Sequence, residues 1–292
     1  MNTAGKSKLM LIASMFIYGT IGIFRTYIDL PSAMLAMVRG FVGTAFLLIY
    51  IFAARKKVDW AGVKAKLLPL AVTGGLIGLN WMLLFEAYNY TSVAAATLCY
   101  YMAPVFVILA SPMIGEKIGV RKAVCVAAAL AGMVLVSGVL KAGFSAGELK
   151  GVALGLGAAA LYASVILMNK RIGAVDAYGK TVIQLFAAAL VLLPYVIFSG
   201  QLRALRPDAA DIALTAVLGV VHTGIAYALF FASFEKVEAQ TVALFGYIDP
   251  AVAIVLSALV LGQMPDVYGV TGTVLIFGAM IVSEIKMPLR QK

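Results

Sequence analysis

The chain has 292 residues, of which 63% are hydrophobic and only 12% are charged. A soluble domain of this size could not cover so much apolar surface, so the composition excludes an ordinary soluble protein. The net charge of +10 does not predict a nucleic-acid partner, because membrane topology explains it better.

Long apolar segments follow one another along the whole chain and are joined by short connectors. A helix needs about 20 residues to cross a bilayer. Ten segments near this length can be marked, at residues 9–28, 31–53, 67–88, 91–114, 120–140, 148–169, 177–198, 211–234, 238–261 and 266–285. The first resembles a signal peptide, but we interpret it as a membrane helix because similar segments follow it and no small-residue cleavage site interrupts it. We expect an all-α, multi-pass protein of the bacterial inner or plasma membrane.

The basic residues predict the orientation, because cytoplasmic connectors carry most of the lysine and arginine. With the N-terminus inside, 17 of the 23 basic residues fall in the inner connectors and 4 in the outer ones. The other two, Arg25 and Arg39, lie within predicted spans. Both termini are therefore expected to be cytoplasmic. The basic excess is a topology signal first, and contact with lipid headgroups is secondary.

The two halves of the chain are similar to each other. Aligning them places Tyr101 over Tyr247, and we divide the chain into residues 1–142 and 143–292, with five predicted spans each. Because five is odd, the second unit has the opposite orientation in the bilayer. Inverted repeats are typical of secondary transporters, which bind substrate near the midplane between the halves. A duplicated structural or assembly protein is the alternative.

A short motif near the end of each half carries a family resemblance. It combines a proline, a glycine followed by an acid or amide, and a glycine in the next span: Pro104, Gly115-Glu116-Lys117 and Gly132, then Pro250, Gly262-Gln263 and Gly278. This order resembles the end of an EamA unit of the drug/metabolite transporter superfamily, although Gln263 replaces the usual glutamate. Arg39 resembles a recurring arginine of that family. The resemblance implies a ten-helix transporter of small metabolites, with a cavity between the halves and export as the direction.

Asp249 lies near the middle of the ninth predicted span, and His222 lies at a similar depth in the eighth. A charge at mid-bilayer costs roughly 2.5–3.5 kcal/mol, so such residues normally face protein or water. Asp249 is a candidate for substrate binding or proton coupling, with His222 as partner or relay. The alternatives are a packing pair, or capping by Asp249 of backbone freed by Pro250. His222 is the only histidine and the two cysteines, Cys99 and Cys125, fall in apolar segments, so we expect no metal site.

Four further charged residues lie near helix ends or within spans. In a functional role, Arg39 would bind a substrate carboxylate or phosphate. In a structural role, it would pair with an acid or with helix C-terminal carbonyls. Because the resembled family has a recurring arginine at this place, we favour the structural role. Arg25 and Glu86, both near the outer boundary, are a candidate gate pair, and a solvated arrangement is an equal alternative. Glu116, at a predicted cytoplasmic turn, is interpreted as a helix-end or loop contact.

Aromatic residues inside the spans form a second group of candidates. A tyrosine hydroxyl at this depth needs a partner or a wet cavity, and an aromatic pocket would suit a planar group or a cation. For any single aromatic, ordinary packing is the alternative. Because Tyr101 and Tyr247 are equivalent in the repeat, both should face the central cavity or both should face away. The aromatic residues inside the spans are Tyr18, Trp81, Tyr100, Tyr101, Tyr162, Tyr227, Phe245 and Tyr247. Of these, the candidate substrate-binding residues are Tyr18, Trp81, Tyr101, Phe245 and Tyr247.

Together these features predict a secondary transporter, not an enzyme, that moves a small polar metabolite by alternating access. Amino acids or related zwitterions are the first candidate substrates, with Arg39 on the carboxylate and Asp249 on the amine. Cationic or aromatic amines are the second. An integral membrane enzyme and a channel are the alternatives from other classes. Proton coupling and uncoupled diffusion both stay open, and we expect a monomer in membrane lipid that needs no cofactor and has no nucleic-acid partner.

Overall fold

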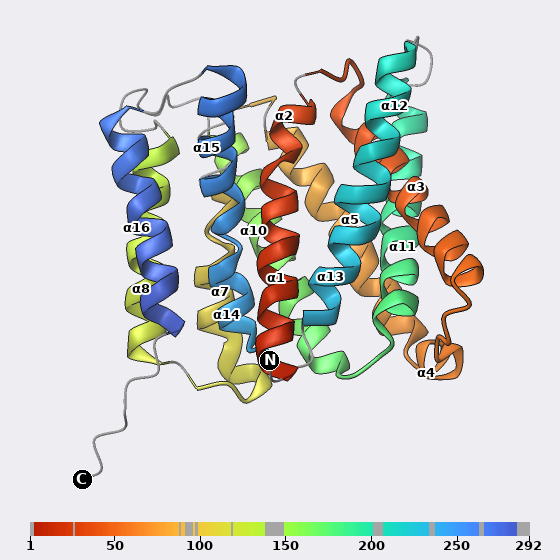
Figure 1. The fold of residues 1–292 in the computed structure, drawn as a ribbon, viewed down its shortest axis with the longest axis horizontal. Helices are drawn as coiled ribbons and strands as arrows, with labels where there is room; N and C mark the ends of the chain where they lie inside the picture. The colour runs from red at the N-terminus through yellow and green to blue at the C-terminus, as the bar shows by residue number, and fades with distance from the viewer. Residues whose placement is uncertain are drawn as a thin grey trace.

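The computed structural model describes residues 3–25, 27–87, 89–90, 96, 99–117, 119–137, 149–200, 207–233, 237–262 and 266–284. Within these ranges every regular element is a helix (Figure 1). They are α1 (Thr3–Gly19), α2 (Ile21–Arg25), α3 (Ser32–Ala53), α4 (Trp60–Ala65), α5 (Leu67–Ala87), α7 (Ala103–Ala110), the 3₁₀ helix η1 (Ser111–Ile114), α8 (Val120–Ser137), α10 (Leu149–Ile172), α11 (Ala177–Phe198), α12 (Ala209–Val217), the π-helix η4 (Leu218–Ile225), α13 (Ala226–Ser233), α14 (Ala239–Phe245), α15 (Ile248–Leu261) and α16 (Val267–Glu284).

Seven helical segments of the described residues are long and apolar enough to cross a membrane. Two shorter apolar helices, Ala103–Ile114 and Val267–Ala279, lie within the fourth and tenth predicted spans. Large apolar side chains such as Phe52 and Phe198 are exposed on the outside, as expected for a surface in contact with lipid. The all-helical, multi-pass prediction is confirmed. The count of ten crossings, the inverted repeat and the cytoplasmic termini stay predictions.

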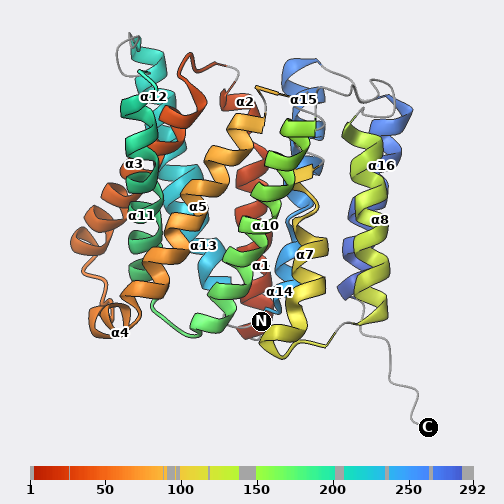
Figure 2. The same cartoon turned by 180° about the vertical axis from the view of Figure 1, so that it is seen from behind.

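The helices lie side by side in one bundle (Figures 1 and 2). At one side of the bundle α8 packs against α16, and at the other α3, α5 and α11 pack together. Between them, α1 packs against α13 and α15. The first described helix begins and the last ends at the same end of the bundle (Figure 1).

The ninth predicted span is broken in its middle. Between α14 and α15, Gly246 and Tyr247 form a turn, and α15 then begins two residues before Pro250. Proline has no N–H to donate to the carbonyl one turn earlier, which accounts for a break at this point. The first half has the equivalent feature, because a turn at Tyr101 and Met102 precedes α7.

Two predicted spans depart from a regular α-helix. The turn between α14 and α15 separates Asp249 from Thr241 and Phe245, with which it would share a stripe at four-residue steps in a continuous helix. The eighth span, predicted over residues 211–234, contains the π-helix η4, which carries His222. Such wide turns occur mostly as local insertions in α-helices and are frequent at functional sites.

The glycines of the repeated motif have a conformational role. Gly115 ends η1 with φ 83°, and its counterpart Gly262 follows α15 with φ 66°. Glycine adopts this left-handed conformation without the steric cost that a Cβ would bring. The motif therefore marks where a helix stops in each half.

Candidate functional site

Aromatic side chains from five segments meet inside the bundle. The ring centroid of Tyr18 in α1 is 5.3 Å from that of Tyr227 in α13, which is 6.0 Å from that of Trp81 in α5. Tyr162 of α10 stacks on Tyr100 with 5.6 Å between ring centroids. Tyr18 interacts electrostatically with Tyr162. These five residues form one group, which we call the central cluster.

Arg39 of α3 lies against the central cluster. Its guanidinium carbon is 4.6 Å from the centroid of the Trp81 ring, within cation–π range. The groups that interact with it electrostatically include Tyr18, Tyr100 and Tyr227. Its Nε has no hydrogen-bond partner in the described part of the chain. This Nε is a buried atom, and an unpaired polar atom is costly inside a protein.

Asp249 enters the same region from the first turn of α15. Its carboxylate accepts a hydrogen bond from the Tyr101 side chain and interacts electrostatically with Tyr18 and Tyr162. Gly19 lets α1 approach α15 here, because an added Cβ would lie 2.7 Å from the carbonyl oxygen of Asp249. The close helix contact therefore brings Tyr18 to the carboxylate.

The two charged groups lie among the same aromatic residues. Five side chains of this region keep some accessible surface: Tyr18, Arg39, Tyr162, Tyr227 and Asp249. The hydroxyl oxygen of Tyr18 and the Nε of Arg39 are themselves inaccessible. Tyr18 interacts electrostatically with both Arg39 and Asp249. Nowhere in the described ranges do three His, Cys, Asp or Glu side chains gather as metal ligands would.

His222 has partners other than Asp249. Its Nε2 lies 2.7 Å from Oγ1 of Thr20, and its ring centroid is 4.9 Å from that of Phe24. The expected pair of His222 and Asp249 is not among the contacts that the structure gives for either residue. In this arrangement His222 fastens η4 to the turn between α1 and α2.

Tyr247 and Tyr101 contact each other. Their rings stack with 5.8 Å between centroids, and the Tyr247 hydroxyl donates to the backbone oxygen of Tyr101 at 2.8 Å. Tyr247 and Phe245 are both buried, whereas Tyr101 is partly accessible and hydrogen-bonds Asp249. Their equivalence in the repeat did not predict this contact, and the expectation that both face a central cavity or both face away stays a prediction.

Of the proposed gate pair, only Glu86 has a described side chain. Its Oε2 accepts a hydrogen bond from the Tyr195 hydroxyl at 3.3 Å and from Nδ2 of Asn89 at 3.0 Å. The side chain of Arg25 lies outside the described residues, so the pair stays a prediction.

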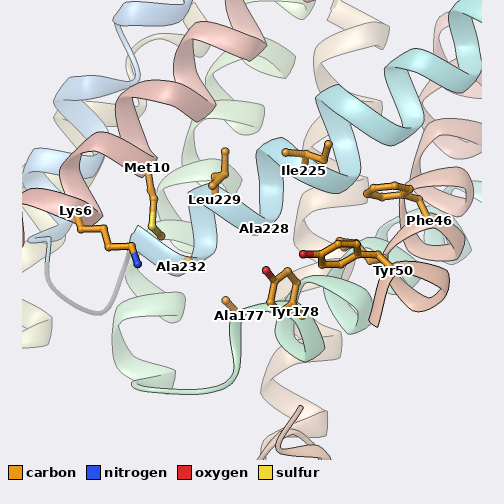
Figure 3. A pocket seen from close by; sticks show the side chains of 11 residues that line it. Lys6, Met10, Phe46, Tyr50, Ala177, Tyr178, Ile225, Ala228, Leu229 and Ala232 are labelled. Carbon is orange, nitrogen blue, oxygen red and sulfur yellow. The ribbon is translucent and has the colours of Figure 1, made fainter. Parts of the chain in front are cut away.

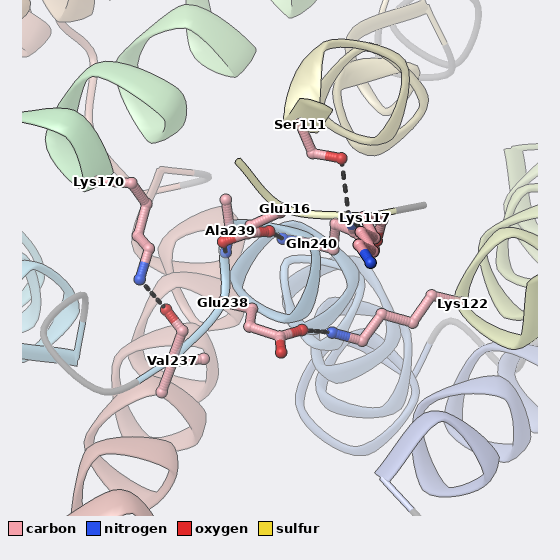
Figure 4. Close-up of polar contacts among 9 residues, drawn as sticks. All are labelled: Ser111, Glu116, Lys117, Lys122, Lys170, Val237, Glu238, Ala239 and Gln240. Carbon is pink, nitrogen blue, oxygen red and sulfur yellow. Dashed lines mark hydrogen bonds and ion pairs between the residues drawn. The ribbon is translucent and has the colours of Figure 1, made fainter. Parts of the chain in front are cut away.

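A polar junction joins the two halves near one end of the bundle (Figure 4). Glu116, which follows η1, accepts hydrogen bonds from the backbone N–H groups of Ala239 at 2.8 Å and Gln240 at 3.4 Å. The Gln240 side chain donates to Ser111 Oγ at 2.8 Å and to the Lys117 carbonyl at 3.1 Å. The carboxylate thus serves the unpaired N–H groups at the start of α14.

Two lysines extend this contact, which we call the α14 junction. Lys122 of α8 forms an ion pair with Glu238, and Lys170 of α10 donates to the Val237 carbonyl at 2.7 Å. The sequence indicated a helix-end contact for Glu116, but nothing in it identified the start of α14 as the partner.

Tyr162 and Tyr227 were counted among the span aromatics but were not assigned to the site. The sequence held one signal that Tyr162 belongs to the site, because Tyr162 corresponds to Tyr18 in the other half.

Comparison with known proteins finds a family model, related proteins and a solved structure of similar fold. The model of the EamA-like transporter family matches residues 6–138 and again 149–284. The uncharacterized transporter YxxF of Bacillus subtilis is 31% identical over 283 residues, covering 95% of this chain and 89% of that protein. Protein RarD of Escherichia coli is 27% identical over 268 residues, covering 88% and 86%. One crystal structure matches with a TM-score of 0.83 at 20% identity, over 95% of this chain and 97% of its own, which shows a shared fold.

The apolar helical bundle and the matched families define a multi-pass cell-membrane transporter, not an enzyme. The chain belongs to the EamA-like transporter family.

Proposed function

We propose that the protein is a secondary transporter for a small zwitterion, with amino acids as the first candidates. We propose further that substrate binds between Arg39, Asp249 and the central cluster, in a space that we call the central cavity. Arg39 would hold the carboxylate, Asp249 the ammonium group, and the tyrosines the remainder of the molecule. The protein would act as a monomer, and the family resemblance suggests export.

One observation carries this proposal. Arg39, whose buried Nε has no partner in the described residues, and Asp249 both interact with Tyr18. A cation and an anion beside one group of aromatic side chains match the two charges of a zwitterion. A ligand carrying only one charge would leave the other protein group without a counter-charge, which is costly inside a protein.

The α14 junction supports an alternating-access mechanism. Its bonds link Glu116 and Lys122, in the predicted first half, to the start of α14 in the second, at Ala239 and Glu238. Rocking of the halves would have to break these contacts to open the central cavity at this end. We infer that the structure has this end closed, and that it faces the cytoplasm if the predicted orientation is correct.

The test is counterflow in proteoliposomes with a panel of amino acids, their amine-only analogues and their carboxylate-only analogues. A zwitterion transporter should accelerate exchange of the amino acids alone, and both Asp249→Asn and Arg39→Gln should abolish it. Asp266→Asn and Arg121→Gln are the matched charge-neutralising controls outside the cavity and should retain exchange. No saturable exchange with any amino acid, or normal exchange in both cavity variants, would contradict the proposal.

Transport of cationic or aromatic amines is the second candidate, because tyrosine rings and a carboxylate also suit an organic cation. In that case amine-only analogues exchange, Arg39→Gln keeps activity and Asp249→Asn loses it. Proton coupling through Asp249 would appear as uptake driven by an imposed pH gradient, and that response should disappear in Asp249→Asn.

A further inference from the structure

A second cavity, of about 470 Å³, lies between α1, α3, α11 and α13 (Figure 3). It shares no lining residue with the central cavity. Its volume falls within the range of roughly 300–1,000 Å³ that is usual for small-molecule sites. Its lining is mostly apolar, and includes Met10, Phe46, Leu47, Ala228 and Leu229.

The polar groups of this second cavity are few and lie at its margins. Among the described residues of its lining, Lys6 alone is charged. Tyr50 and Tyr178 form a hydrogen-bonded pair with 5.7 Å between ring centroids. Figure 3 shows their hydroxyls directed into the space, and Lys6 extending on its opposite side. An apolar chamber with a cation and two hydroxyls fits an amphiphile whose polar end is an anion.

The position of the second cavity favours a lipid over a dissolved molecule. It is formed where α1 begins, α3 ends and α11 begins, which is the side predicted to be cytoplasmic. Ile225 of its lining is 38% exposed on a bundle whose outer surface is apolar, so the cavity reaches the lipid-facing surface. Lys56 adds further positive charge, with its Nζ 5.8 Å from the Tyr50 ring. Basic pockets between membrane helices on the cytoplasmic side are suited to anionic headgroups.

We propose that the second cavity binds an anionic phospholipid of the cytoplasmic leaflet. One acyl chain lies against Leu229 and its apolar neighbours, and the phosphate lies near Lys6. The hydroxyls of Tyr50 and Tyr178 bind other headgroup or ester oxygens. This site is independent of the substrate site, and the lipid would stabilise the packing of α1 and α13 against α3 and α11.

The experiment is a lipid titration of the detergent-purified protein by native mass spectrometry, with phosphatidylglycerol and phosphatidylcholine of identical acyl chains as probes. Phosphatidylglycerol should bind more tightly. Lys6→Gln should weaken phosphatidylglycerol binding about fivefold, because one lysine beside an anionic headgroup strengthens binding by about this factor. Phosphatidylcholine binding should change much less. Lys8→Gln, which removes the same charge two residues away and outside the cavity lining, should leave both affinities unchanged.

A second variant tests the acyl-chain chamber. Ala228→Phe fills it and should abolish binding of both lipids, provided that thermal unfolding shows an intact fold. Equal affinity for the two lipids, or equal effects of Lys6→Gln and Lys8→Gln, would overturn the proposal. So would full competition by glycerol 1-phosphate, which would indicate a site for a free anion. Transport is not measured here, so failure of this proposal is distinct from failure of the transport proposal.

Discussion

The α14 junction gives a prediction whose size can be worked out from the structure. Glu116 accepts one well-placed bond from Ala239 N–H at 2.8 Å and one long bond from Gln240 N–H at 3.4 Å. First-turn N–H groups have no partner within their own helix. Loss of a single hydrogen bond to a charged acceptor costs about 2 kcal/mol. Glu116→Ala should therefore raise the population with an open junction about 30-fold.

Hydrogen–deuterium exchange reads this change directly, because the two amides bonded to Glu116 are the exchanging groups. Peptides containing Ala239 and Gln240 should exchange about 30-fold faster in Glu116→Ala. Glu116→Gln keeps a neutral acceptor and should fall between wild type and Glu116→Ala. The matched control is Glu238→Gln, since Glu238 is 64% exposed and its ion pair with Lys122 is worth little. Exchange in Glu116→Ala no faster than in Glu238→Gln would refute the reasoning.

Two further predictions concern helix packing. An added Cβ at Gly74 would lie 2.5 Å from the Gln184 carbonyl oxygen, so Gly74→Ala should destabilise the protein by about 1–3 kcal/mol. Gly75→Ala meets only an apolar side chain at 3.6 Å and should leave the melting temperature unchanged; equal losses would contradict the close contact. Asn80→Ala removes a buried bond of 2.6 Å to the Ala158 carbonyl and should cost about 1 kcal/mol in thermal unfolding, whereas an unchanged melting temperature would show that the bond contributes nothing.

Several features of the site could be predicted because they depend on the chain alone. An apolar segment must become a helix in lipid, where each backbone group needs an internal partner. Charge inside such a segment is costly, so Asp249 and Arg39 had to face protein or water. The repeat related Tyr101 to Tyr247.

The pairings between segments could not be predicted, since they depend on how the helices pack. His222 was expected beside Asp249 because both lie at similar depth, but rotation about each helix axis decides the neighbours, and His222 contacts Thr20. Likewise the sequence marks Glu116 as a helix-end residue without showing that Ala239, far along the chain, supplies the N–H.

Membrane insertion was thus determined by the sequence itself, because hydrophobicity and charge act locally. Only the tertiary structure decided which polar groups lie together. Helices of nearly uniform apolar surface have no hydrophobic preference for one partner face over another in lipid. Close contacts such as Gly19 against α15 and bonds such as Glu116 to α14 fix the packing, and that packing brings both Arg39 and Asp249 to Tyr18.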